Sequence, residues 1–63
     1  MRDPNRIPRI LQKLEILWKK SPDMRLGQLI ESATVFGGTK ADTFNTEDEI
    51  TEHGIEKLLE KLR

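Results

Sequence analysis

Apolar residues recur at spacings of three and four along the first third of the chain, the pattern of an amphipathic helix. The stripe consists of Ile7, Ile10, Leu11, Leu14, Leu17 and Trp18. We predict a helix over residues 6–20, with Asn5 as its N-cap. Pro8 then falls in the first turn, where its missing amide hydrogen has no partner to lose.

A second helix is predicted after a short link. The sequence Ser21-Pro22-Asp23 is typical of a helix start, with serine as the N-cap and proline at the first helical position. One face of this helix would carry Leu26, Leu29, Ile30 and Ala33. Gly27 weakens the helix intrinsically, so its presence predicts a close approach to the first helix.

The helical period fails over residues 34–45, where a loop is expected, with Phe36 and Phe44 inserted in the core. The pair Gly37-Gly38 permits a positive φ there, and a short extended piece at Thr43-Phe44 is left open. The sequence Thr46-Glu47-Asp48-Glu49 then matches a capping box for a third helix. The apolar stripe of that helix is Ile50, Ile55, Leu58, Leu59 and Leu62.

These patterns predict one all-α domain over residues 1–63, a small orthogonal arrangement of three helices. Because His53-Gly54 interrupts the helical propensity of the last segment, a bend or a division of the third helix there is an open alternative. A chain of 63 residues buries a small core. Completion of that core by a partner, including a second copy of the chain, is therefore also open.

The residue inventory argues against an enzyme. The chain contains no cysteine and one histidine, His53, which we place on a polar helix face. A serine–histidine–acid site would need Ser21 or Ser32, and Ser21 already serves as a cap in this interpretation. We therefore predict no catalytic residue, no metal site and no cofactor. No stretch approaches the roughly 20 apolar residues that cross a bilayer, so we expect a cytoplasmic protein without a membrane partner.

Charge is unevenly distributed although the chain is neutral. Residues 1–26 hold seven basic and three acidic residues, whereas residues 27–63 hold four basic and eight acidic ones. The candidate nucleic-acid contacts are Arg6, Arg9, Lys13 and Lys20. The zero net charge and the absence of interleaved aromatic residues favour a simpler interpretation, in which these groups are solvated or pair with the acidic third helix.

The most distinctive segment is Pro22-Asp23-Met24-Arg25-Leu26-Gly27-Gln28-Leu29-Ile30. Together with residues 6–20 and the segment from Phe44 to Glu49, it resembles a family of short uncharacterised proteins encoded by bacteria and by their phages or prophages. The resemblance spans nearly the whole chain and implies a helical fold, without an established activity to carry over. Residues 37–41 and His53-Gly54 are less typical of that family.

Two functional hypotheses follow. The first is a non-enzymatic protein that binds an unidentified protein or itself, as a homodimer. Its candidate interface is Trp18, Arg25, Gln28 and Phe44. The structural alternative for these residues is core packing of Trp18, a hydrogen bond from Gln28 to a loop carbonyl, and pairing of Arg25 with the acidic turn at residues 47–49. The second hypothesis is a nucleic-acid-binding accessory protein that uses the basic first helix.

Overall fold

Three helices form where the apolar residues recur at helical spacing, and the all-α prediction is confirmed. The computed structural model describes residues 2–38 and 42–62. Its elements are α1 (Arg6–Lys20), α2 (Leu26–Phe36), a single 3₁₀ turn η1 (Thr43–Asn45) and α3 (Asp48–Lys61), and the described residues contain no β-strand. None of these helices is both long enough and apolar enough to span a bilayer.

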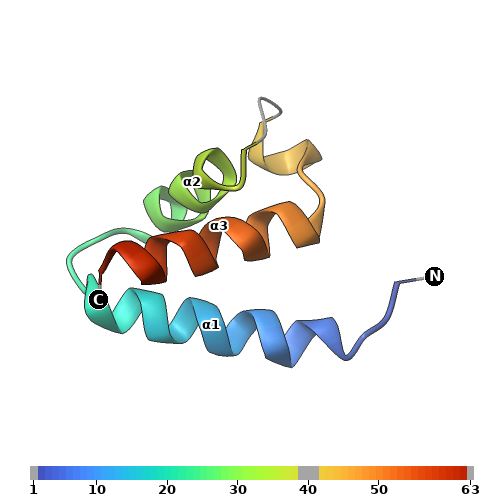
Figure 1. Cartoon of the computed structure of the whole chain (residues 1–63), viewed down its shortest axis with the longest axis horizontal. Helices are drawn as coiled ribbons and strands as arrows, with labels where there is room; N and C mark the ends of the chain where they lie inside the picture. Colours follow the sequence, from blue (N-terminus) through green and yellow to red (C-terminus); the bar gives the residue numbers. More distant parts are fainter. Residues whose placement is uncertain (1, 39–41, 63) are drawn as a thin grey trace.

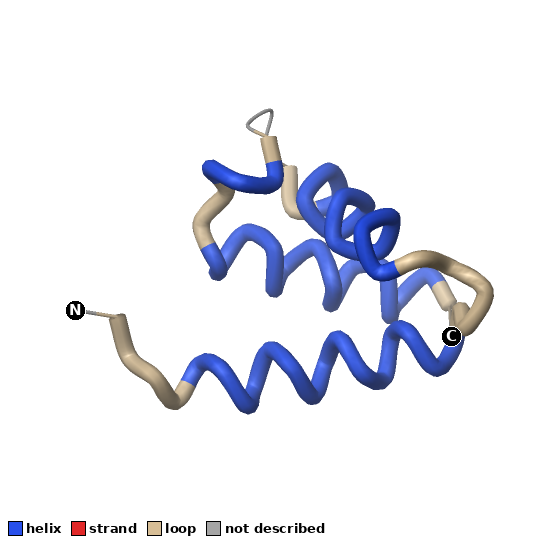
Figure 2. The backbone as a smooth tube through the Cα atoms, turned by 180° about the vertical axis from the view of Figure 1, so that it is seen from behind, coloured by secondary structure: helices blue, strands red, loops and turns tan. Residues whose placement is uncertain are grey.

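Helix α3 is the middle element of the domain and packs against both other helices (Figure 1). Helices α1 and α3 lie side by side and run in the same direction, whereas α2 is seen nearly end-on and crosses them. The view from behind also shows α3 between α1 and α2 (Figure 2). The buried apolar side chains are Leu17 from α1, Leu29 and Ala33 from α2, and Ile55 from α3. Each helix thus contributes to one small core.

Helix α1 has the predicted bounds, but the predicted starts of both other helices are wrong. Helix α2 begins at Leu26 rather than after Ser21, because the carbonyl of Ser21 accepts a hydrogen bond from the amide of Met24 (3.1 Å) and closes a turn first. Helix α3 begins at Asp48, because the Thr46 hydroxyl donates to the carbonyl of Asp42 (2.6 Å) instead of capping the helix. Asn5 precedes α1 as predicted but makes no capping hydrogen bond with its side chain.

The predicted loop is shorter than expected, because α2 continues through Phe36. Gly38 adopts the positive φ that the glycine pair permits (φ +90°), and residues 39–41 lie outside the described part of the chain. Thr43 and Phe44 belong to the 3₁₀ turn, so the extended piece left open there is not formed. Phe36 is partly buried beside the Lys61 ammonium, 4.9 Å from the ring centroid, whereas Phe44 is 95% exposed and is not a core residue.

The close approach between helices occurs at Gly54, not at Gly27. A Cβ atom on Gly54 would overlap the carbonyl oxygen of Ala33 and approach the amide nitrogen of Gly37, whereas a Cβ on Gly27 would meet nothing within 4 Å. Helix α3 runs unbroken through His53 and Gly54, so the bend or division that the sequence left open is absent. The glycine weakens the helix locally but lets α2 and α3 pack backbone to backbone.

Substituting Gly54 with alanine is expected to lower the free energy of unfolding by about 2–3 kcal/mol, because the added methyl group collides with backbone that cannot move independently. Equilibrium urea denaturation followed by circular dichroism measures the change. The matched control is Gly27→Ala, which replaces an exposed helical glycine and should raise stability by about 0.5–1 kcal/mol. Equal stability of Gly54→Ala and the unmodified chain would contradict the proposed close packing.

Candidate functional site

Four large apolar side chains of helix α1 are exposed to solvent: Ile7, Leu11, Ile16 and Trp18. Leu17 is buried against α3 and α2, and Ile10 and Leu14 are partly buried beside it. In contrast, Ile7, Leu11 and Trp18 remain 49%, 57% and 37% exposed. The apolar face predicted for this helix is therefore wider than the contact that α3 offers. We call the line formed by the exposed Ile7, Leu11 and Trp18 together with the partly buried Leu14 the α1 stripe.

The α1 stripe ends in an open groove of about 450 Å³. Its lining residues come from the second half of α1 and from the following turn: Leu11, Leu14, Glu15, Trp18, Lys19 and Pro22. The two charged members pair with each other, since Lys19 Nζ lies 2.9 Å from Glu15 Oε2. The groove thus combines apolar walls with an electrically neutral edge.

The indole of Trp18 is held in place by its own chain. Its Nε1–H donates to the carbonyl oxygen of Met24 at 2.9 Å, which ties the end of α1 to the turn before α2. Because this donor is already satisfied, covering the indole with an apolar partner would leave no polar atom of the ring without a hydrogen bond.

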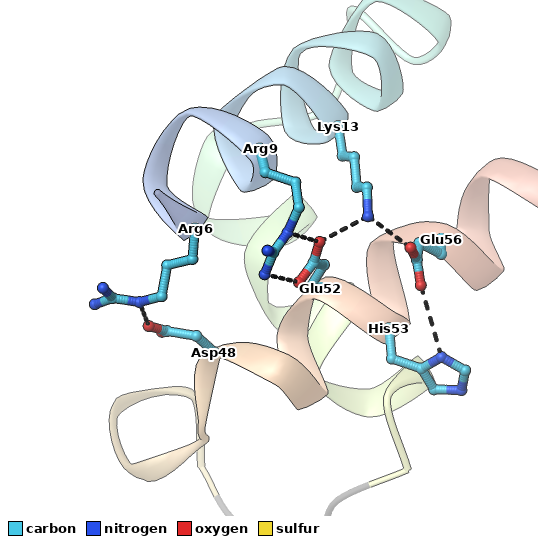
Figure 3. A network of polar contacts seen from close by, with 7 residues as sticks. All are labelled: Arg6, Arg9, Lys13, Asp48, Glu52, His53 and Glu56. Carbon is cyan, nitrogen blue, oxygen red and sulfur yellow. Dashed lines mark hydrogen bonds and ion pairs between the residues drawn. The ribbon is translucent and has the colours of Figure 1, made fainter. Parts of the chain in front are cut away.

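Three basic side chains of α1, those of Arg6, Arg9 and Lys13, face α3 and pair with its acids (Figure 3). Arg9 makes a two-pronged contact with Glu52, at 2.8 and 2.9 Å, and Lys13 reaches both Glu52 and Glu56 at 2.6 Å. Arg6 donates to Asp48 at 2.6 Å. The partners advance together along the two parallel helices, so these contacts fix the register of α1 on α3.

Glu52 is the centre of this ion-pair ladder. Its side chain is 11% exposed, and hydrogen bonds first from Arg9 and then from Lys13 lower the pKa of its carboxyl group to about 2. Hydrogen bonding to Glu52 correspondingly raises the pKa of Lys13. Three of the four candidate nucleic-acid contacts are therefore engaged with carboxylates of the same chain, and Lys20 is the exposed fourth. This arrangement favours internal pairing over a phosphate-binding surface.

The four predicted interface residues belong to different surface features of the domain. Trp18 belongs to the α1 stripe, whereas Gln28 lines a shallow groove on α2. The side chain of Gln28 accepts from the amide of Arg25 at 3.0 Å, so it caps α2 rather than binding a loop carbonyl. Arg25 was expected to pair with the acidic turn at residues 47–49. Two acids of that turn pair with other residues instead, Glu47 with Arg2 and Asp48 with Arg6.

Phe44 stands at the tip of a well-tied turn. The Asp42 carboxylate accepts from the backbone and the side chain of Asn45, at 2.9 and 2.8 Å. The Thr43 hydroxyl lies 3.3 Å from that of Thr34, which is buried in α2. Gln28 lies six residues before Thr34, or roughly 9 Å along the helix axis, so Phe44 and Gln28 flank opposite ends of α2.

Sequence reasoning missed Ile7 and Leu11 as candidate interface residues, because both fit the apolar stripe that was assigned to the core. The available signal was the width of that stripe. Six apolar positions within twelve residues cover more of the helix surface than one neighbouring helix can bury. His53, by contrast, lies on the exposed side of α3 as predicted, with Nδ1 3.9 Å from Glu56 Oε1 (Figure 3).

Comparison with known proteins adds no assignment: no family model, no curated protein and no solved structure matches this chain. Within residues 2–38 and 42–62, no group of three or more histidine, cysteine or acidic side chains is arranged to hold a metal ion. The candidate site is accordingly defined by its surface chemistry, a neutral apolar face on α1.

Replacing Glu52 with glutamine should lower the free energy of unfolding by about 1–3 kcal/mol, because two cations lose a poorly solvated charged partner. Chemical denaturation at neutral pH and low salt measures the loss. Glu15→Gln is the matched control, since its exposed pair with Lys19 is worth about 0.5 kcal/mol or less. A Glu52→Gln loss no larger than that of the control would contradict a central role for Glu52.

The stabilisation from Glu52 should also depend on pH with a defined sign. Its pKa in the folded chain, about 2, is below the ordinary value of 4.5, so the contribution is present above pH 4.5 and disappears between pH 4.5 and 2. The difference in unfolding free energy between the unmodified chain and Glu52→Gln should therefore shrink across that interval. A difference that stays constant from pH 6 down to pH 2.5 would exclude this linkage.

Proposed function

We propose that this chain is a non-enzymatic protein-interaction domain that binds its partner through the α1 stripe and the adjoining groove. The observation that supports the proposal is the row of exposed apolar side chains on a helix whose neighbouring side is fixed to α3. Exposed apolar residues that form a continuous surface are typical of protein-binding sites, whereas isolated ones are common on any surface.

The contacts made by the basic side chains distinguish this proposal from nucleic-acid binding. A phosphate-binding surface needs cations that can neutralise phosphates and so release the counterions condensed on the nucleic acid. Here Arg6, Arg9 and Lys13 already face carboxylates, and Lys19 pairs with Glu15. Binding to nucleic acid would have to break these pairs, whereas an apolar partner could cover the α1 stripe and leave them intact.

The resemblance to short bacterial and phage or prophage proteins supports a partner of bacterial origin. The cytoplasm is the proposed compartment, because a domain that folds without disulfides is stable there. A bacterial lysate is accordingly the appropriate source of partners.

A capture experiment with one added charge tests the proposal. The immobilised chain is compared with Leu11→Lys, which places a cation in the α1 stripe, and with Val35→Lys, which places the same charge on an exposed position of α2. We expect Leu11→Lys to reduce partner capture about tenfold or more and Val35→Lys to leave it unchanged, because a charge buried in an apolar interface is costly.

The direction in which Leu11→Lys changes binding distinguishes the protein-binding hypothesis from the nucleic-acid-binding one. Nucleic-acid binding should strengthen in both lysine variants, because each adds a cation. Capture that survives Leu11→Lys but disappears in Phe44→Ala would move the site to η1 and contradict the role of the α1 stripe. Circular dichroism of each variant confirms that a loss of capture is not a loss of fold.

A further inference from the structure

We infer that the occupant of the α1 stripe is a second copy of this chain, whose own α1 packs antiparallel to the first across a two-fold axis. This inference rests on the proposed function and names its partner. The two-fold axis would pass close to residues 12 and 13, the midpoint between Ile7 and Trp18. Each copy would then contribute the same surface to both sides of the interface.

The α1 stripe differs at its two ends: Ile7 is exposed outside the groove at one end, which we call the protruding end, and the groove forms a hollow toward the other. Ile7, which is 49% exposed, lies at the beginning of the helix, and the groove lined by Leu14, Trp18 and Pro22 lies at its end. An antiparallel two-fold axis brings each protruding end to the hollow end of the other copy. Parallel pairing would instead place the two Ile7 side chains together and leave both grooves open.

The spacing of the α1 stripe suits helix pairing. Its four members are separated by four, three and four residues, the spacing of the core positions in a two-helix coiled coil. About the midpoint of the stripe, Leu11 faces Leu14 of the second copy and Ile7 faces Trp18 of the second copy. The large Trp18 of each copy therefore meets the smaller Ile7 of the other. All four pairs of facing side chains along the interface are apolar.

The charges that flank the α1 stripe favour this occupant over an ionic one. On the α3 side, Arg6 and Lys13 are neutralised by Asp48, Glu52 and Glu56. On the other side, Lys19 is paired with Glu15. Two copies can thus approach without like-charge repulsion, whereas neither an anionic lipid surface nor an acidic peptide would find an unpaired cation along the stripe.

The size of the surface limits the expected affinity. A standard interface removes roughly 800 Å² from each partner, which is about a sixth of the 4878 Å² that this chain exposes. One face of a four-turn helix is smaller than that. The pair should therefore exchange rapidly, and the dimer should be weak and transient, as is typical of small interfaces.

Single-cysteine cross-linking tests both the partner and the orientation, because the chain has no cysteine of its own. In the antiparallel pair the two Leu11 positions are offset by roughly 4–5 Å along the axis and the two Ile7 positions by roughly 16 Å. A thiol cross-linker with a reach of about 10 Å, comparable to the spacing between helix axes, can join the first pair and not the second. Val35→Cys, exposed on α2, measures random collisions.

We expect Leu11→Cys to form covalent dimer at least about tenfold faster than Ile7→Cys and Val35→Cys. Sedimentation of the unmodified chain should show dimer increasing with concentration, and Leu11→Lys should remain monomeric while Val35→Lys behaves like the unmodified chain. Rapid cross-linking of Ile7→Cys would overturn the antiparallel arrangement. Rates equal to the Val35→Cys background, with a monomer at every concentration, would overturn self-pairing.

The same preparations separate this inference from the function on which it rests. A monomeric chain that still captures a different protein through Leu11 overturns the second copy as occupant and leaves the interaction function intact. A monomeric chain that sediments with zwitterionic or anionic lipid vesicles, and loses that property in Leu11→Lys, overturns both in favour of a membrane surface.

Discussion

The contact between Gly54 of α3 and Ala33 of α2 is the constraint on which the rest of the structure depends. The two backbones are so close that no side chain fits between them, and Gly37 at the end of α2 packs against Ile50 in the same way. This contact places the polypeptide backbones of α2 and α3 in direct apposition, and Leu29 and Ile55 fill the adjoining core. With one side of α3 occupied in this way, α1 must pack on another side of the same helix.

The attachment of α1 differs in kind from that of α2. Its buried contribution is essentially Leu17 with parts of Ile10 and Leu14, and its register is fixed by ion pairs to Glu52 and its neighbours. Ion pairs at the edge of a helix contact cover little apolar surface, and an exposed pair contributes about 1 kcal/mol or less. The charge asymmetry between the two halves of the chain is thus used inside the molecule, and the apolar half of α1 is left uncovered.

The success of sequence reasoning varied with the range of the interaction involved. The bounds of α1 depend on its own periodicity and were predicted correctly, as was the positive φ within the glycine pair at Gly38. The caps at Ser21 and Thr46 failed, because turn hydrogen bonds with residues a few positions away took their place. Gly27 and Gly54 look alike in the sequence, and only the position of α2 against α3 distinguishes the exposed glycine from the packed one. The exposure of Phe44 likewise depends on the fold of the 42–46 turn.

The candidate site could be predicted from the sequence only in part, for a related reason. The apolar pattern of α1 identifies which residues avoid water but not which neighbour covers them, since a core face and an interface face have the same period. Trp18 was recognised because tryptophan is common in interfaces, whereas Ile7 and Leu11 are ordinary core residues in composition. In a chain with four buried apolar side chains among its described residues, the exposed ones form a surface comparable to the core itself. A helix that is fixed by charge on one side and exposes apolar side chains on an adjacent side is suited to joining this domain to another molecule.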